Sequence, residues 1–140
     1  MSWASLSRVS VAHVALVLVV VCGCHGSVEK LTLVPVTGKV TLGESLLTAG
    51  NVVFTREGPE PKVMARGLID KNGTFELNTA GAAGAPPGRY KVTVFSGRPG
   101  APIKSSSIPA RYSSAEESPL EIQVVEHPSP GAYDLKLTKN

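Results

Sequence analysis

The sequence predicts an all-β fold in which about seven short strands form two sheets. Glycine and proline account for 14 and 11 of the 140 residues, whereas aromatic residues make up only 5%. After residue 35, apolar and polar residues alternate with a period of two, and turn-forming residues interrupt the pattern repeatedly. Such alternation buries one face of a strand. Because a single sheet would leave its apolar face in water, two sheets have to pack together.

The N-terminal segment has the composition of a signal peptide. One positive charge, Arg8, precedes thirteen mostly aliphatic residues at positions 9–21. As a helix this run would span about 20 Å, which is less than the roughly 30 Å hydrocarbon core of a bilayer. We therefore expect residues 1–23 to be a cleaved signal and not a permanent membrane span.

The end of this segment, Val21-Cys22-Gly23-Cys24, resembles the lipobox of bacterial lipoproteins. The resemblance implies cleavage before Cys24 and transfer of a diacylglycerol to its thiol, because Gly23 is small enough to precede the cleaved bond. It places the mature protein on a membrane of the cell envelope. The residue after Cys24 is His25 and not Asp. In lipoproteins this favours sorting to the outer membrane, so the resemblance implies a place on the periplasmic or surface side of that membrane. An ordinary secretory signal remains the alternative, and a metal or redox pair of Cys22 with Cys24 lacks further ligands.

After a tether over residues 24–35, the alternating pattern predicts the strands in order. They are expected at 36–42, 51–57, 63–69, 74–79, 89–96, 120–126 and 132–139, with a short return at 46–47. Their inward side chains are expected to be Val36, Val40, Leu42, Val52, Phe54, Phe75, Leu77, Tyr90, Val92, Val94, Leu120, Ile122, Val124, Tyr133, Leu135 and Leu137, with Lys91 and Thr93 facing outward. Strands 63–69 and 74–79 form the clearest hairpin, since the turn between them ends on Gly73, where a positive φ is easily adopted.

Two segments lack this periodicity. Residues 80–88 are expected to be a mobile loop. The longer segment, residues 97–119, is unusual in a compact domain, where such loops often carry function. The segment holds Arg98, Lys104, Arg111 and Tyr112, which could form the rim of a site for an anionic or sugar-like ligand. The alternative, which we favour, is that residues 108–112 fold back and plug the open end of the sandwich.

Four segments resemble carboxypeptidase regulatory-like domains, which share the transthyretin (prealbumin-like) sandwich. They are residues 35–42 (PVTGKVTL), 50–54 (GNVVF), 65–75 (ARGLIDKNGTF) and 87–94 (PGRYKVTV). The resemblance extends from Pro35 to about Thr138, and it implies a seven-stranded Greek-key β-sandwich at 36–140. Domains of this family are usually accessory modules, so the resemblance implies a non-catalytic role. Gly38 and Gly67 are expected where an inward side chain would crowd the opposing sheet.

The residues give no support for an enzyme. Enzymatic transthyretin relatives use His and Arg residues with a C-terminal Tyr-Arg-Gly-Ser sequence, whereas Arg111-Tyr112-Ser113-Ser114 of this chain is internal. His25 and His127, the histidines after the signal, have no evident partner. Asp70 and Asn72 are better explained as turn formers than as calcium ligands. We expect no cofactor and no metal.

Charge also limits the partners. The net charge is +3 for the whole chain, and Arg8 of the signal contributes one unit of it. Basic and acidic residues are mixed, without a basic stripe, so no nucleic-acid partner is expected. The expected function is a lipid-anchored structural or protein-interaction module, held to the membrane through Cys24, with an envelope protein or a glycan as its partner. The alternative is a carbohydrate- or small-ligand-binding lipoprotein that uses the segment 97–119.

Overall fold

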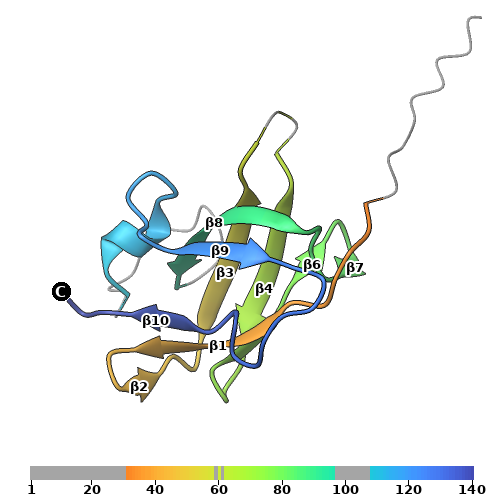
Figure 1. The fold of residues 1–140 in the computed structure, drawn as a ribbon. Helices are drawn as coiled ribbons and strands as arrows, with labels where there is room; N and C mark the ends of the chain where they lie inside the picture. Colours follow the sequence, from red (N-terminus) through yellow and green to blue (C-terminus); the bar gives the residue numbers. More distant parts are fainter. Residues whose placement is uncertain (1–30, 59, 61, 97–107) are drawn as a thin grey trace, which may run out of the picture.

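The computed structural model describes residues 31–58, 60, 62–96 and 108–140 (Figure 1). The predicted signal and Cys24 lie outside these residues, as do Arg98 and Lys104. The described strands are β1 (Thr37–Leu42), β2 (Ser45–Leu46), β3 (Gly50–Arg56), β4 (Met64–Ile69), β5 (Thr74–Glu76), β6 (Asn78–Thr79), β7 (Ala82–Ala83), β8 (Gly88–Phe95), β9 (Glu121–Val124) and β10 (Leu135–Leu137). A 3₁₀-helix, η1 (Ala110–Ser113), precedes β9. Across these described ranges, no helix is both long and apolar enough to cross a membrane.

The strands form two sheets, which confirms the predicted all-β class. One sheet has the order β10-β1-β2, with β5 also paired to β1, and the other has the order β7-β6-β4-β3-β8-β9. β1 and β10 are parallel, with Val40 opposite Leu135. β3 is the centre of the larger sheet and pairs antiparallel with β4 on one side and with β8 on the other.

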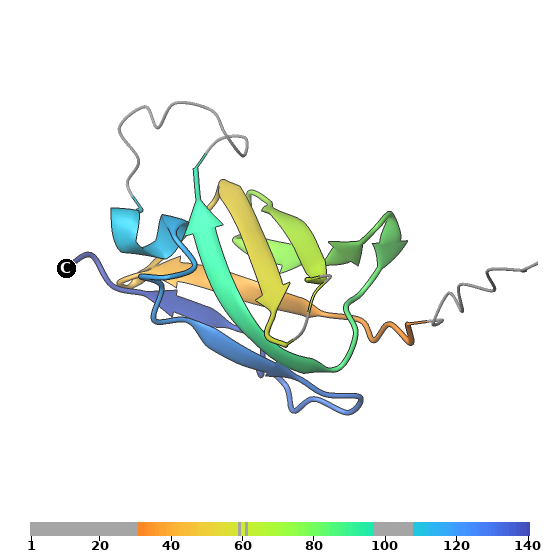
Figure 2. The same cartoon turned by 90° about the horizontal axis from the view of Figure 1, so that it is seen from above.

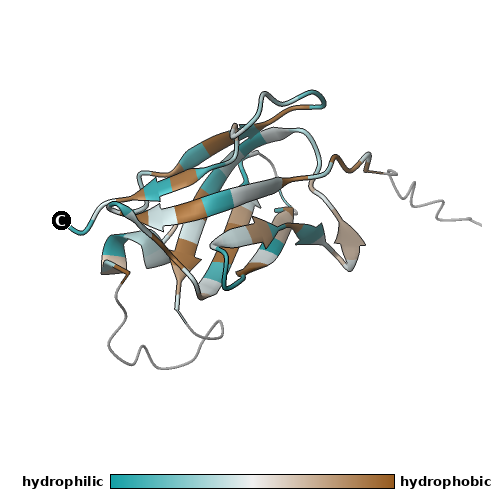
Figure 3. Ribbon diagram, turned by 90° about the horizontal axis from the view of Figure 1, so that it is seen from below, coloured by the Kyte–Doolittle hydropathy of each residue, from teal (hydrophilic) through white to brown (hydrophobic). Residues whose placement is uncertain are grey.

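Buried side chains from both sheets form one core. Alternation of apolar and polar residues is visible along the strands in Figure 3. The rings of Phe75 and Tyr90 lie 6.0 and 5.9 Å from that of Phe54, at tilted angles that favour aromatic contact. The predicted inward residues are buried, except that Leu120 and Ile122 are only partly so. Thr93 was expected to face solvent but is buried, and η1 packs against the strand β8 that carries it.

The predicted strand at 74–79 is divided between the two sheets, so the expected hairpin is only partly correct. β5 leaves β4 and pairs with β1, with Gly38 opposite Phe75. β6 then returns to β4, with Ala65 opposite Thr79. At the crossing, a Cβ on Gly67 would lie 2.6 Å from the backbone oxygen of Glu76. The missing side chain therefore lets the two strands cross closely before they diverge, as at the corners of packed sheets.

Residues 80–88 are not the irregular loop that the sequence predicts. Ala80 and Gly81 have φ values of 49° and 87° and join β6 to β7 in a two-residue turn, as tight hairpins require. Ala85 is buried and bridged to Val34, a buried residue of the predicted tether. Apolar periodicity misses this hairpin because alanine and glycine contribute little to it, and Gly84 is needed where the chain lies against the carbonyl of Val34.

Different structural elements lie at the two ends of the molecule. The described chain begins, at residue 31, at the end where β6 and β7 lie. The 3₁₀-helix η1 and the C-terminus lie at the opposite end (Figures 1 and 2). We call these the tether end and the distal end. β1 runs from the tether end toward the distal end, and β10 runs parallel to it. The candidate residues in 108–119 therefore belong to the distal end.

Candidate functional site

Arg111 and Tyr112, two of the sequence-predicted ligand residues, belong to η1 at the distal end. The side chains of Ile108 and Tyr112 are buried in the core. This burial agrees with the interpretation that residues 108–112 fold back on the sandwich. The remaining two candidates, Arg98 and Lys104, lie outside the described residues.

Arg111 and Tyr112 both bind Thr138, just after β10. The Tyr112 hydroxyl accepts the backbone N–H of Thr138 at 2.9 Å, and Arg111 Nη2 donates to Thr138 O at 2.9 Å and to its Oγ1 at 2.6 Å. The guanidinium also lies 4.8 Å from the centroid of the Tyr112 ring, a cation–π distance. Burial raises the pKa of Tyr112, but the hydrogen bonds from Thr138 and Arg111 outweigh this and leave the pKa below its ordinary value. These contacts hold the C-terminal strand.

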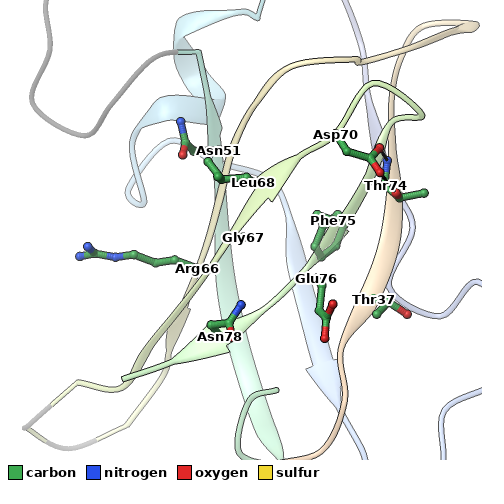
Figure 4. Close-up of a pocket in the computed structure, with 10 residues that line it drawn as sticks. All are labelled: Thr37, Asn51, Arg66, Gly67, Leu68, Asp70, Thr74, Phe75, Glu76 and Asn78. Carbon is green, nitrogen blue, oxygen red and sulfur yellow. Dashed lines mark hydrogen bonds between the residues drawn. The ribbon is translucent and has the colours of Figure 1, made fainter. Parts of the chain in front are cut away.

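A different part of the molecule has the shape of a binding site. A groove of about 530 Å³ lies where β5 diverges from β4 (Figure 4). We call it the corner groove. It is lined by Thr37, Asn51, Arg66, Gly67, Leu68, Asp70, Thr74, Phe75, Glu76 and Asn78. Its volume is within the range of small-ligand sites, about 300–1,000 Å³.

The turn between β4 and β5 closes one end of the corner groove. The Asp70 carboxylate accepts hydrogen bonds from the backbone N–H of Asn72 and Thr74, at 2.8 and 2.9 Å, and from the Thr74 hydroxyl at 2.7 Å. The bond from the Thr74 hydroxyl is the main reason why the pKa of Asp70 lies below its ordinary value. Asp70 therefore stays ionised and serves as a fixed acceptor that orders the turn, as the sequence predicts.

The two walls of the corner groove carry different groups. Figure 4 shows Arg66 and Leu68 on one side, and Thr37 and Glu76 on the other. Leu68 is 73% exposed and offers an apolar surface to the groove. Arg66 makes a long contact of 3.7 Å with Met64 Sδ, and neither Arg66 nor Glu76 takes part in an ion pair among the described residues. The groove can therefore offer a cation, an anion and an apolar contact to a ligand.

Sequence reasoning did not identify Arg66, Glu76 or Asn78 as candidates. A usable signal was present, because Arg66 and Leu68 are consecutive outward positions of a well-predicted strand. The sequence did not indicate the opposite wall of the groove. That wall exists because β5 leaves β4 and pairs with β1 in the other sheet. Elsewhere in the described chain, no three His, Cys, Asp or Glu side chains gather as a metal site would require.

The comparisons with known proteins give no relative for this chain. It matches no protein-family model, no curated protein and no solved structure.

Proposed function

We propose that this chain is a non-catalytic, lipid-anchored protein of the cell envelope, whose β-sandwich is a structural or protein-interaction module. The observation that carries the proposal is the sequence Val21-Cys22-Gly23-Cys24, which ends a run of thirteen mostly aliphatic residues at positions 9–21. A single acyl chain gives only marginal membrane attachment. The diacylglycerol that a lipobox cysteine receives supplies two chains, which makes the attachment stable.

The proposal includes the finer fold, a seven-stranded Greek-key sandwich of the prealbumin-like type. If β5 and β6 are counted as one bent strand, and the two-residue strands β2 and β7 as additions, seven strands remain. The test is an NMR assignment of cross-strand contacts in the mature chain. Contacts of β1 with both β5 and β10 are expected, and a chain in which β5 pairs fully along β4 would contradict the proposed arrangement.

The chemistry of the corner groove supports a binding role more than a catalytic one. A general acid needs a carboxyl group whose pKa is raised toward neutral pH. The hydrogen bonds that Asp70 accepts lower its pKa instead. An ionised carboxylate that is already held by three donors can accept a further hydrogen bond from a ligand, but it is a poor proton donor.

The lipid anchor is tested by metabolic labelling of cells with a palmitate analogue. Wild-type protein and Cys22→Ser are expected to incorporate label, whereas Cys24→Ser is expected to lose it and to leave the membrane fraction. Cys22→Ser is the matched control, because it changes a neighbouring thiol on the signal side of the cleaved bond. Label retained by Cys24→Ser, or a mature N-terminus at another residue, would overturn the proposal.

A second candidate function is the binding of a carbohydrate or another small polar ligand, and the corner groove is the observation that favours it. The sequence placed such a site on the segment 97–119, whereas Arg111 and Tyr112 are engaged with Thr138. Arg66→Ala and Glu76→Gln are therefore expected to weaken any binding seen on a glycan array, with melting temperatures unchanged. Binding that depends on Arg98 or Lys104 instead would favour the original placement.

A further inference from the structure

We propose that the tether end of the sandwich lies against the bilayer that holds the lipid anchor, so that the distal end faces away from the membrane. The contacting surface is made of Leu31, the hairpin at 80–83 and Val125. This inference rests on the proposed lipidation of Cys24. It adds a second, non-covalent contact between the folded domain and the lipid surface.

The chain leaves the domain next to the hairpin at 80–83. Val34 and Ala85 exchange two backbone hydrogen bonds of 3.0 Å, which fix the start of the domain beside β7. In Figures 1 and 2 the start of the described chain, in orange, and β7, in green, are at the same end of the molecule. The last residue of β9, Val124, pairs with Gly88 shortly after the hairpin, and Val125 directly follows it. The three parts of the contacting surface therefore lie at the end of the domain where the described chain begins.

The tether is short compared with the domain. Six residues lie between Cys24 and Leu31, and the seven residue steps from one to the other span at most about 25 Å when fully extended. A folded domain of about 100 residues has a radius of gyration near 13 Å, so its diameter exceeds this reach. A domain anchored at Cys24 can therefore move at most about 25 Å from the bilayer, and its tether end is the part held nearest to the lipid.

The surface of the tether end suits the headgroup region. Residues 78–88 include no charged side chain, and Ala80, Ala82 and Ala83 are exposed. Two of the large apolar side chains that remain exposed are also at this end, namely Leu31 at 41% and Val125 at 38%. The hairpin at 80–83 carries no charge, so it can enter the interface without the cost of desolvating an ion. The contact can be weak, because the anchor keeps its effective concentration high.

The same geometry directs the distal end outward. Eight residues lie between Val34 and Gly43 along β1, and the nine residue steps correspond to about 30 Å of extended chain. The turn after β1, η1 and the C-terminus therefore project away from the bilayer (Figure 1). Partners in the surrounding space would reach this end first.

The test uses the full chain, matured in cells and reconstituted in vesicles of phosphatidylethanolamine and phosphatidylglycerol. Two variants, Ala82→Cys and Glu44→Cys, receive a fluorophore that brightens in apolar surroundings. Both positions are exposed, and they lie at the tether end and the distal end respectively. Cys22 leaves with the signal and the lipidated Cys24 has no free thiol, so only the introduced cysteine reacts. Circular dichroism melts of the two variants serve as the folding control.

Labelled Ala82→Cys is expected to emit severalfold more brightly on vesicles than in detergent-free buffer, and a nitroxide on the lipid headgroups is expected to quench it. Labelled Glu44→Cys is expected to show little of either effect. Equal quenching at both positions, or stronger quenching at position 44, would overturn the orientation while leaving the anchor intact. Absence of the lipid on Cys24 by mass spectrometry would overturn the proposed function itself, and the orientation with it.

Discussion

The hydroxyl of Tyr112 accepts the backbone N–H of Thr138 at 2.9 Å, across 26 residues of chain. This bond joins η1 to the segment that follows β10, and Arg111 reinforces it by donating to the carbonyl of the same threonine. The residues that looked most like a ligand rim in the sequence therefore stabilise the C-terminal strand. Four consequences of the geometry can be measured.

Tyr112→Phe is expected to keep the buried ring and lose the bond to Thr138. Because Thr138 is exposed and its N–H can bind water in the variant, the expected cost is the net contribution of one hydrogen bond, about 0.5–1.5 kcal/mol, measured as the free energy of unfolding in urea. Tyr112→Ala, which also empties the ring's place in the core, is expected to cost about 3–5 kcal/mol. If Tyr112→Phe were as stable as wild type, the hydroxyl would contribute nothing to holding the strand.

Gly67→Ala is expected to destabilise the fold, because its Cβ would lie 2.6 Å from the backbone oxygen of Glu76. Overpacking of this kind costs about 1–3 kcal/mol. The neighbouring Leu68→Ala is the control, since changes at exposed positions usually stay within about 0.5 kcal/mol. Equal unfolding midpoints for the two variants would show that β4 and β5 do not need their close crossing at Gly67.

Tyr90 is expected to make the fold sensitive to alkali. Burial raises the pKa of its hydroxyl, which donates to the carbonyl oxygen of Pro86 at 2.7 Å. A group whose folded pKa is raised contributes stability that is complete below its unfolded pKa, about 10 for tyrosine, and that is lost as the pH rises through the folded value. Unfolding free energies measured from pH 8 to 11 are expected to fall at the alkaline end.

The Tyr90→Phe variant separates this effect from general alkaline denaturation. It is expected to be less stable than wild type at neutral pH, because the carbonyl of Pro86 loses its donor. Its stability is also expected to fall less steeply above pH 10. Parallel curves for the two proteins would assign the alkaline loss to other groups.

Asp70→Ala is expected to lower the melting temperature by removing the acceptor that orders the turn at 70–73. The pKa of Asp70 lies below its ordinary value of 3.8, so its contribution is present above that value and is lost as the pH falls through the folded pKa. The difference in melting temperature between wild type and Asp70→Ala is therefore expected to shrink in acid. Lys71→Ala, in the same turn, is the control. A difference that stayed constant from pH 7 to 2 would contradict this role for the carboxylate.

Much of the sandwich was predictable because a period of two reports directly which side of a strand is buried. Val36, Val40 and Val52 could be assigned to the core on that basis, and so could Tyr90. The turn at 70–73 was also predictable, because its side-chain and backbone chemistry is local. The hairpin at 80–83 was not, since Ala80 adopts a positive φ that no local signal demands.

The sequence by itself determined the all-β class, the inward faces of the strands and the expectation of a lipid anchor at Cys24, which stays a prediction. Only the tertiary structure decided that residues 74–79 divide between two sheets, that this division opens the corner groove, and that Arg111 and Tyr112 bind Thr138. The reason is physical. Alternation specifies the face that a strand buries, but strand pairing and long-range hydrogen bonds depend on chain segments that meet only when the fold closes.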